Sequence, residues 1–128
     1  MASFIEHVAL FADDLEASRD FFVRTFGMKV VLDNSKAPVR GYFLAGAGGS
    51  VLEVIERPKG QTNANQRFVC HVAFAVDDLD ATRKLIEAEG LVFETDTIVE
   101  TPEFRTAFFR DPEGNRIQIL KRAVSLVG

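Results

Sequence analysis

Several residue types that mark particular classes of protein are scarce or missing in this chain. Its 128 residues contain no Trp, one Tyr, one Cys and four Pro. The lone Cys70 cannot form a disulfide within the chain, which excludes a disulfide-stapled scaffold and fits a reducing compartment. No apolar run approaches the roughly 18 residues of a membrane-spanning helix, so we expect no membrane partner.

Clustered positive charge is also missing. The chain has 15 Lys and Arg against 19 Asp and Glu, a net charge of −4, and its basic residues are scattered. Nucleic-acid-binding domains usually present a basic patch, so this balance argues against a nucleic-acid partner. The start of the chain, MASFIEHVAL, lacks the basic region and apolar stretch of a signal peptide. We therefore expect a cytoplasmic protein.

Phe is the residue present in excess. Twelve Phe and a 47% hydrophobic composition indicate a folded protein with a Phe-rich core or an apolar pocket. The length suits a single domain, residues 1–128.

An internal repeat organises the chain. FIEHVALFADDLEASRDF, at 4–21, aligns without a gap with FVCHVAFAVDDLDATRKL, at 68–85. The identical pairs are Phe4/Phe68, His7/His71, Val8/Val72, Ala9/Ala73, Asp13/Asp77, Asp14/Asp78, Leu15/Leu79, Ala17/Ala81 and Arg19/Arg83. A weaker match follows in the same order, between RGYFLAGAGGSVLEV at 40–54 and RTAFFRDPEGNRIQI at 105–119. The chain is therefore interpreted as a tandem duplication.

Each copy predicts one strand, one helix and three further strands. The Asp pair after each first strand can cap a helix, and Asp13 with Glu16 and Asp77 with Asp80 resemble capping boxes. Gly27 and Gly90 are expected to end the helices. The predicted strands are 4–11, 28–33, 40–45 and 50–56, then 68–76, 91–96, 104–110 and 115–121.

These elements predict an α+β fold built from two tandem βαβββ modules. The modules span about 1–56 and 68–122, and the polar segment 57–67 is interpreted as a linker. A module of this size has little core of its own, so the two should pack as one unit or exchange between chains. Consecutive antiparallel strands from both would form an incompletely closed barrel or cup with the helices outside.

Four polar residues lie at equivalent positions of the predicted strands. Side chains alternate between the faces of a strand, which places His7, Glu53 and His71 mainly among apolar neighbours, where an unpaired polar group is costly. The duplication pairs His7 with His71 and Glu53 with Gln118. A near-twofold relation between the modules would bring two imidazoles and two side-chain oxygens to one point.

Taken alone, a strand His is more often a core residue and a strand Glu usually faces solvent. Taken together, the four residues indicate a centre for one divalent ion, because both modules supply the same type of ligand at the same place. Two nitrogen and two oxygen ligands suit Zn, Ni, Fe, Mn or Co rather than Ca or Mg. Cys70 is adjacent to His71, points to the opposite face and is expected in the core.

The chain resembles the vicinal oxygen chelate superfamily, which includes glyoxalase I, epimerases, extradiol dioxygenases, thiol transferases and bleomycin-resistance proteins. The resemblance is carried by IEHVALFADDLEASRDFF near the start, LEVIE at 52–56, CHVAFAVDDLDA at 70–81, and FRDPEGNRIQIL at 109–120. By position, His7, Glu53, His71 and Gln118 match the metal ligands of glyoxalase I. The resemblance also implies a twofold homodimer and a small-molecule substrate with adjacent oxygens.

Two departures from the family pattern shape the expected function. The last ligand is commonly Glu and here is Gln118, and Phe11 matches an Arg that glyoxalase I uses for glutathione. The resemblance implies a proton-accepting Glu at the positions of Glu53 and Gln118; since a carboxamide cannot do this, Glu53 is the expected base, and Gln118→Glu is expected to keep or raise activity. The leading prediction is a glyoxalase-I-like lyase or isomerase. The alternatives are an epimerase, thiol transferase or extradiol dioxygenase, or a non-catalytic binding or resistance protein.

Overall fold

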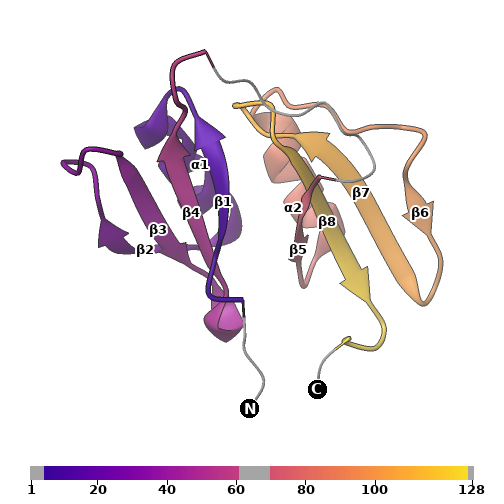
Figure 1. Cartoon of the computed structure of the whole chain (residues 1–128). Coiled ribbons are helices and arrows are strands. Elements are labelled where there is room, and N and C mark those ends of the chain that lie inside the picture. Colours follow the sequence, from indigo (N-terminus) through magenta and orange to yellow (C-terminus); the bar gives the residue numbers. More distant parts are fainter. Residues whose placement is uncertain (1–4, 61–69, 127–128) are drawn as a thin grey trace. The chain divides into compact units, whose positions relative to one another are not determined.

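The computed structural model describes residues 5–60 and 70–126, and the chain divides into two compact units, Met1–Asn63 and Ala64–Gly128 (Figure 1). Each unit has the order strand, helix and three strands. This confirms the predicted α+β class with two βαβββ modules. None of the helices among the described residues is long and apolar enough to span a membrane.

The first unit is a four-stranded mixed sheet with one helix. Its sheet has the order β1-β4-β3-β2, in which β1 runs parallel to β4 and the other neighbours are antiparallel. Helix α1 packs against β3 and β4. The elements are β1 (Val8–Ala12), α1 (Leu15–Phe26), β2 (Lys29–Asp33), β3 (Gly41–Ala45), a 3-10 turn η1 (Ala47–Gly49) and β4 (Val51–Glu56).

The second unit repeats this topology. Its sheet has the order β5-β8-β7-β6, with β5 parallel to β8 and the remaining pairs antiparallel. The prediction of consecutive antiparallel strands is therefore wrong for β1 and β5, because a helix follows each of them and the chain returns beside the last strand of its unit. The elements are β5 (Val72–Ala75), α2 (Leu79–Ala88), β6 (Val99–Glu100), β7 (Phe104–Arg110) and β8 (Arg116–Arg122).

The predicted strand 91–96 is wrong. The sixth strand is the two-residue β6, and within 91–96 only Phe93 forms a bridge, with Phe109. Phe93 is buried while its neighbour Val92 is 81% exposed. The Glu94 N–H also donates to the Phe108 carbonyl of β7 at 2.8 Å, and its carboxylate binds Arg116, so the segment contacts β7 without forming a continuous strand.

The N-cap of each helix is the second residue of the Asp pair, not the first. Asp14 and Asp78 are the N-cap residues, and their carboxylates accept hydrogen bonds from the N–H groups of Ala17 and Ala81. The predicted capping boxes starting at Asp13 and Asp77 are therefore wrong. Gly27 caps α1 in the left-handed conformation as predicted, whereas Glu89 caps α2 and Gly90 follows it at φ 84°.

In both units, the acidic residue in the first turn of the helix forms an ion pair with an Arg. Arg40 donates to both oxygens of Glu16, at 3.1 and 2.9 Å, and Arg105 donates to Asp80 at 2.9 Å. Each Arg lies at the start of its unit's third strand region, and the two are equivalent in the repeat. The duplication thus preserved an ion pair that ties the helix N-terminus to the sheet.

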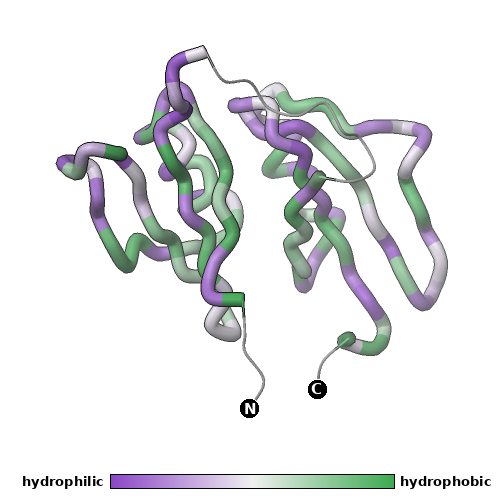
Figure 2. Tube along the Cα trace, viewed as in Figure 1, coloured by the Kyte–Doolittle hydropathy of each residue, from purple (hydrophilic) through white to green (hydrophobic). Residues whose placement is uncertain are grey.

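The strands divide their side chains between a helix-facing side and an opposite side. Leu52, Val54, Ile117 and Ile119 are at most 2% exposed and form the apolar core with the helices. Hydrophilic positions interrupt these hydrophobic stretches along β4 and β8 (Figure 2). Glu53 and Gln118, which lie between these buried residues, face away from the helix, and this opposite side carries the candidate site.

The predicted linker is described only in part. Arg57 is bound to the first unit, because its N–H donates to the Ala12 carbonyl and its Nε donates to Asp13, both at 2.9 Å. Residues 61–67 of that segment lie outside the described residues.

Candidate metal centre

His7 and Glu53 meet on the side of the first sheet that faces away from α1. His7 directly precedes β1, and Glu53 lies in β4 opposite Ala9 in the parallel register. The His7 Nε2 atom is 3.4 Å from Glu53 Oε1, with 35% of the imidazole and 17% of the carboxylate side chain exposed. The two ligands predicted in this module therefore lie next to each other; that they bind an ion stays a prediction.

Glu6 lies against the other nitrogen of the His7 ring. The His7 Nδ1 atom is 3.0 Å from Glu6 Oε1, and a neutral imidazole that donates its Nδ1–H there carries its lone pair on Nε2. Nε2 is then the ring nitrogen that faces the Glu53 carboxylate. A carboxylate on the far nitrogen is the usual second partner of a metal-binding His.

The separation of the two donor atoms fits a transition ion. Ligand atoms at about 2.1 Å from an ion lie roughly 3.4 Å apart in a tetrahedral site and about 3.0 Å apart in an octahedral one. The distance of 3.4 Å between His7 Nε2 and Glu53 Oε1 falls at the tetrahedral value. One imidazole and one carboxylate also match the donor set of Zn, Mn or Fe.

The second unit presents the equivalent residues in the same register. Gln118 lies opposite Ala73 in the parallel pair and opposite Phe108 in the antiparallel pair, as Glu53 lies opposite Ala9 and Phe43. The His71 ring packs edge-on against Phe108 with centroids 5.3 Å apart. His7 packs in the same way against Phe43, at 5.1 Å. One Phe ring therefore packs against each His at the equivalent place.

Gln118 has a polar partner, Thr106, whose equivalent in the first unit is Gly41. Its Nε2 donates to the Thr106 hydroxyl at 2.6 Å, and that hydroxyl donates to the Ile119 carbonyl at 3.1 Å. Gln118 and Thr106 are 8% and 3% exposed. Thr106 escaped the sequence reasoning, although its place two residues before Phe108 on the same face of a strand was a usable signal.

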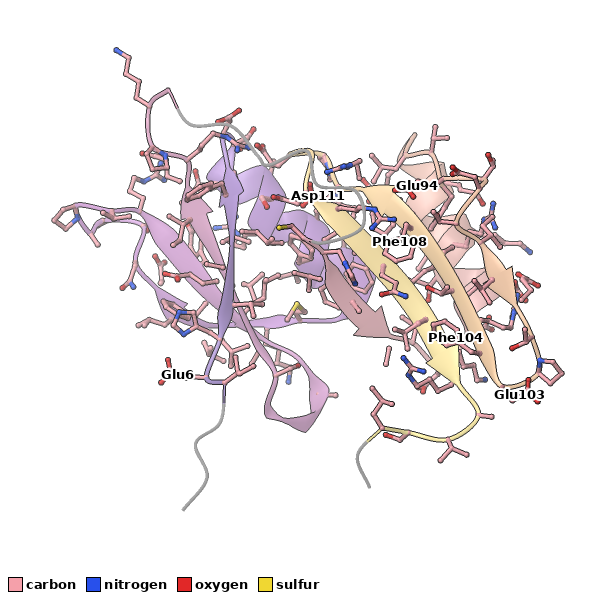
Figure 3. All side chains as sticks on the ribbon, turned by 45° about the vertical axis from the view of Figure 1, so that its right-hand side comes forward. Glu6, Glu94, Glu103, Phe104, Phe108 and Asp111 are labelled. Carbon is pink, nitrogen blue, oxygen red and sulfur yellow. The ribbon has the colours of Figure 1, made fainter. Side chains whose placement is uncertain are left out.

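An ion pair packs against Phe108 in the second unit. Arg116, on β8, donates through Nε and Nη2 to the two oxygens of Glu94 at 2.9 and 3.0 Å. Its guanidinium lies 3.7 Å from the centroid of the Phe108 ring. Glu94 and Phe108 are labelled on this unit in Figure 3. The chain of contacts Glu94, Arg116, Phe108 and His71 was not foreseen from sequence.

The turn between β7 and β8 is held by Asp111. Its carboxylate accepts hydrogen bonds from the N–H of Glu113, the N–H of Asn115 and the Asn115 side-chain amide, at 3.0, 2.8 and 3.0 Å. Burial raises the pKa of the Asp111 carboxyl, and these hydrogen bonds oppose that rise. The turn fixes the register that places Gln118 opposite Phe108.

Of the four predicted ligands, His7 and Glu53 are in contact in the first unit, while His71 and Gln118 of the second unit both lie beside Phe108. Among residues 5–60 and 70–126, no three His, Cys, Asp or Glu side chains are grouped closely enough to hold an ion. The meeting of both pairs at one ion stays a prediction. Cys70 is exposed, so its expected place in the core is wrong.

Comparison with known proteins identifies the family to which the chain belongs. A family model described as the Glyoxalase/Bleomycin resistance protein/Dioxygenase superfamily matches residues 4–119. A probable lactoylglutathione lyase from Vibrio cholerae serotype O1 is 28% identical in an alignment that covers 97% of this chain and 94% of that protein.

Two solved structures share the fold. The fosfomycin resistance protein FosX from Listeria monocytogenes, complexed with Mn(II) and sulfate, matches with a TM-score of 0.75 and 21% identity, over 98% of this chain and 94% of its own. The antibiotic binding protein TnmS3 from Streptomyces sp. CB03234 matches with a TM-score of 0.74 and 22% identity, over 95% of this chain and 98% of its own. The match of the family model over residues 4–119 shows that the chain belongs to the glyoxalase/bleomycin resistance protein/dioxygenase superfamily.

Proposed function

We propose that this protein is a metal-dependent lyase or isomerase of glyoxalase-I-like type that acts on a small substrate with vicinal oxygens. His7, Glu53, His71 and Gln118 would hold one divalent Zn, Ni, Fe, Mn or Co ion. The observation that carries the proposal is the opposed pair His7 Nε2 and Glu53 Oε1, 3.4 Å apart, with the far nitrogen of the ring 3.0 Å from Glu6.

Glu53 is the group that moves the proton. Its carboxylate can take a proton from the carbon next to a substrate carbonyl and return it to the neighbouring carbon, so that the protein ends the cycle unchanged. Gln118 cannot do this, because a carboxamide oxygen does not accept a proton usefully near neutral pH. A divalent ion bound here would polarise the substrate oxygens and stabilise the negative charge that develops on them.

The apolar surroundings favour this role for Glu53. Val51 and Ile55 are its neighbours on the same face of β4, and Phe43 lies beside it in the antiparallel register. Only 17% of the carboxylate side chain is exposed, which limits access of water to the base.

Metal content is the primary test. Protein purified without a His-tag is expected to contain close to one transition ion per chain by elemental analysis. His7→Ala and His71→Ala should each abolish this content, whereas Glu103→Gln, at an exposed carboxylate, should leave it unchanged. A wild-type protein that stays metal-free after incubation with Zn, Ni, Mn and Fe salts would contradict the proposal.

The role of Glu53 is tested by Glu53→Gln. The amide oxygen can still bind the ion, so metal content should persist while kcat falls by at least about a hundredfold, the usual share of general-base catalysis. Glu56→Gln is the matched control, because Glu56 lies on the same strand and binds Arg40 instead. Normal turnover by a metal-loaded Glu53→Gln would place the base elsewhere.

A non-catalytic binding protein is the second candidate. It is supported by the fold shared with the antibiotic binding protein TnmS3 and by the neutral Gln118 at a position where these enzymes commonly have Glu. Metal-free wild-type protein that binds an apolar ligand would favour this candidate.

A further inference from the structure

The hydrogen bonds of Thr106 determine which way the Gln118 amide points. A Thr hydroxyl has one hydrogen to donate and two lone pairs to accept with. The Ile119 carbonyl can only accept, so at 3.1 Å it takes the hydroxyl hydrogen. With that hydrogen given to Ile119, Gln118 meets the same hydroxyl at 2.6 Å as a donor, through its NH2 group.

This constraint leaves the carbonyl oxygen of Gln118 as the atom directed away from Thr106. A carboxamide can bind a cation through oxygen but not through its NH2 group, which has no available lone pair. Without a fixed partner the amide could rotate by half a turn and present its NH2 group at the same place. Gln118 therefore needs an orienting contact that a carboxylate, with two equivalent oxygens, does not need.

The first unit shows the complementary arrangement. Gly41 occupies the position equivalent to Thr106, because it lies opposite Ile55 as Thr106 lies opposite Leu120. A Cβ atom on Gly41 would come within 2.9 Å of the Val54 carbonyl oxygen. That unit has no room for an orienting hydroxyl, and its site residue is Glu53, which requires none.

We propose that Thr106 is a positioning residue that makes Gln118 an oxygen ligand, so that Thr106 and Gln118 function as a pair. This inference rests on the proposed metal site. It also changes what is expected of Gln118→Glu, the variant for which the family resemblance predicts unchanged or higher activity. A carboxylate at this position could not donate to Thr106, so the hydroxyl would have to give its hydrogen to Glu and release the Ile119 carbonyl.

Metal affinity tests the inference. Thr106→Val keeps the shape of the side chain but removes the acceptor for the amide, and we expect the affinity for Zn²⁺ to fall about tenfold or more, the range for residues that orient a ligand. Thr106→Ser retains the hydroxyl and should restore most of the affinity. Thr82→Val is the matched control, because the hydroxyl of Thr82, on α2, donates to the backbone carbonyl of Asp78. Affinities are measured on the full chain by competition with a fluorescent chelator.

A second readout follows the amide itself in the metal-free protein. The side-chain amide resonance of Gln118 should be sharp and protected from exchange in wild type and Thr106→Ser, and exchange-broadened in Thr106→Val. Unchanged affinity in Thr106→Val, even with a lower melting temperature, would overturn the inference, as would an equal loss in Thr82→Val. A wild-type protein without metal affinity would overturn the proposed function as well, so the two failures are distinguishable.

Discussion

Replacing Glu94 by Gln is expected to lower the free energy of unfolding by about 3 kcal/mol. The Arg116 side chain is 1% exposed and its guanidinium binds both oxygens of Glu94, whose side chain is 17% exposed. Removing one partner of a buried ion pair typically costs about 3–5 kcal/mol, because the other charge is left without compensation. The partial exposure of Glu94 places the expected loss at the lower end of that range.

Other contacts of the pair support the same magnitude. Thr97 donates to Glu94 Oε1 at 2.8 Å, and the Arg116 guanidinium stacks on Phe108, so neither charged group can turn to solvent without breaking further contacts. The loss corresponds to a melting temperature lower by roughly 10 °C in a domain of this size. Because Phe108 packs against His71, the change should also loosen the ring of that residue.

Urea unfolding followed by far-ultraviolet circular dichroism measures the effect. Glu87→Gln provides the control, because Glu87 pairs with Arg83 at 3.6 Å on the exposed side of α2, and such a pair contributes only about 0.3–0.5 kcal/mol. The double change Glu94→Gln with Arg116→Met should recover part of the loss, since it removes the uncompensated charge. Equal stability of the Glu94→Gln and Glu87→Gln proteins would refute the reasoning.

Two further predictions concern acid stability and assembly. The hydrogen bond from Arg105 lowers the pKa of Asp80 below 3.8. The stabilisation it gives is present above the unfolded-state pKa and is lost as the pH falls through the lower folded-state value. Asp80→Asn should thus be less stable than wild type at neutral pH, with the difference vanishing in acid titrations below pH 3.8; a constant difference would contradict this. We also expect a homodimer, because β2 is an edge strand that exposes Val30, Val31 and Leu32, and sedimentation showing only the 14.2 kDa species at micromolar concentration would contradict it.

The repeat made much of the architecture predictable from sequence. Equivalent residues of the two copies adopt equivalent elements, so the order of strands and helices in each unit and the α+β class followed from local composition and alternation. These features depend on periods of two and about 3.6 residues, which a single stretch of sequence contains. His7 and His71, which were predicted within strands, lie directly before β1 and β5.

Sequence patterns failed where a contact between distant segments overrides a local preference. The segment 91–96 has the composition of a strand, but Phe93 is buried and Glu94 binds Arg116, 22 residues away. Similarly, the parallel pairing of β1 with β4 depends on where a helix returns the chain.

The tertiary structure alone decided how the site residues are oriented. The His7 Nδ1 atom lies against Glu6, which leaves Nε2 facing Glu53, and the NH2 group of Gln118 donates to Thr106, which leaves the amide oxygen directed elsewhere. The sequence by itself determined which residue types stand at equivalent positions of the two modules. It could not determine which atom each presents, because that depends on partners brought close only when the strands pair.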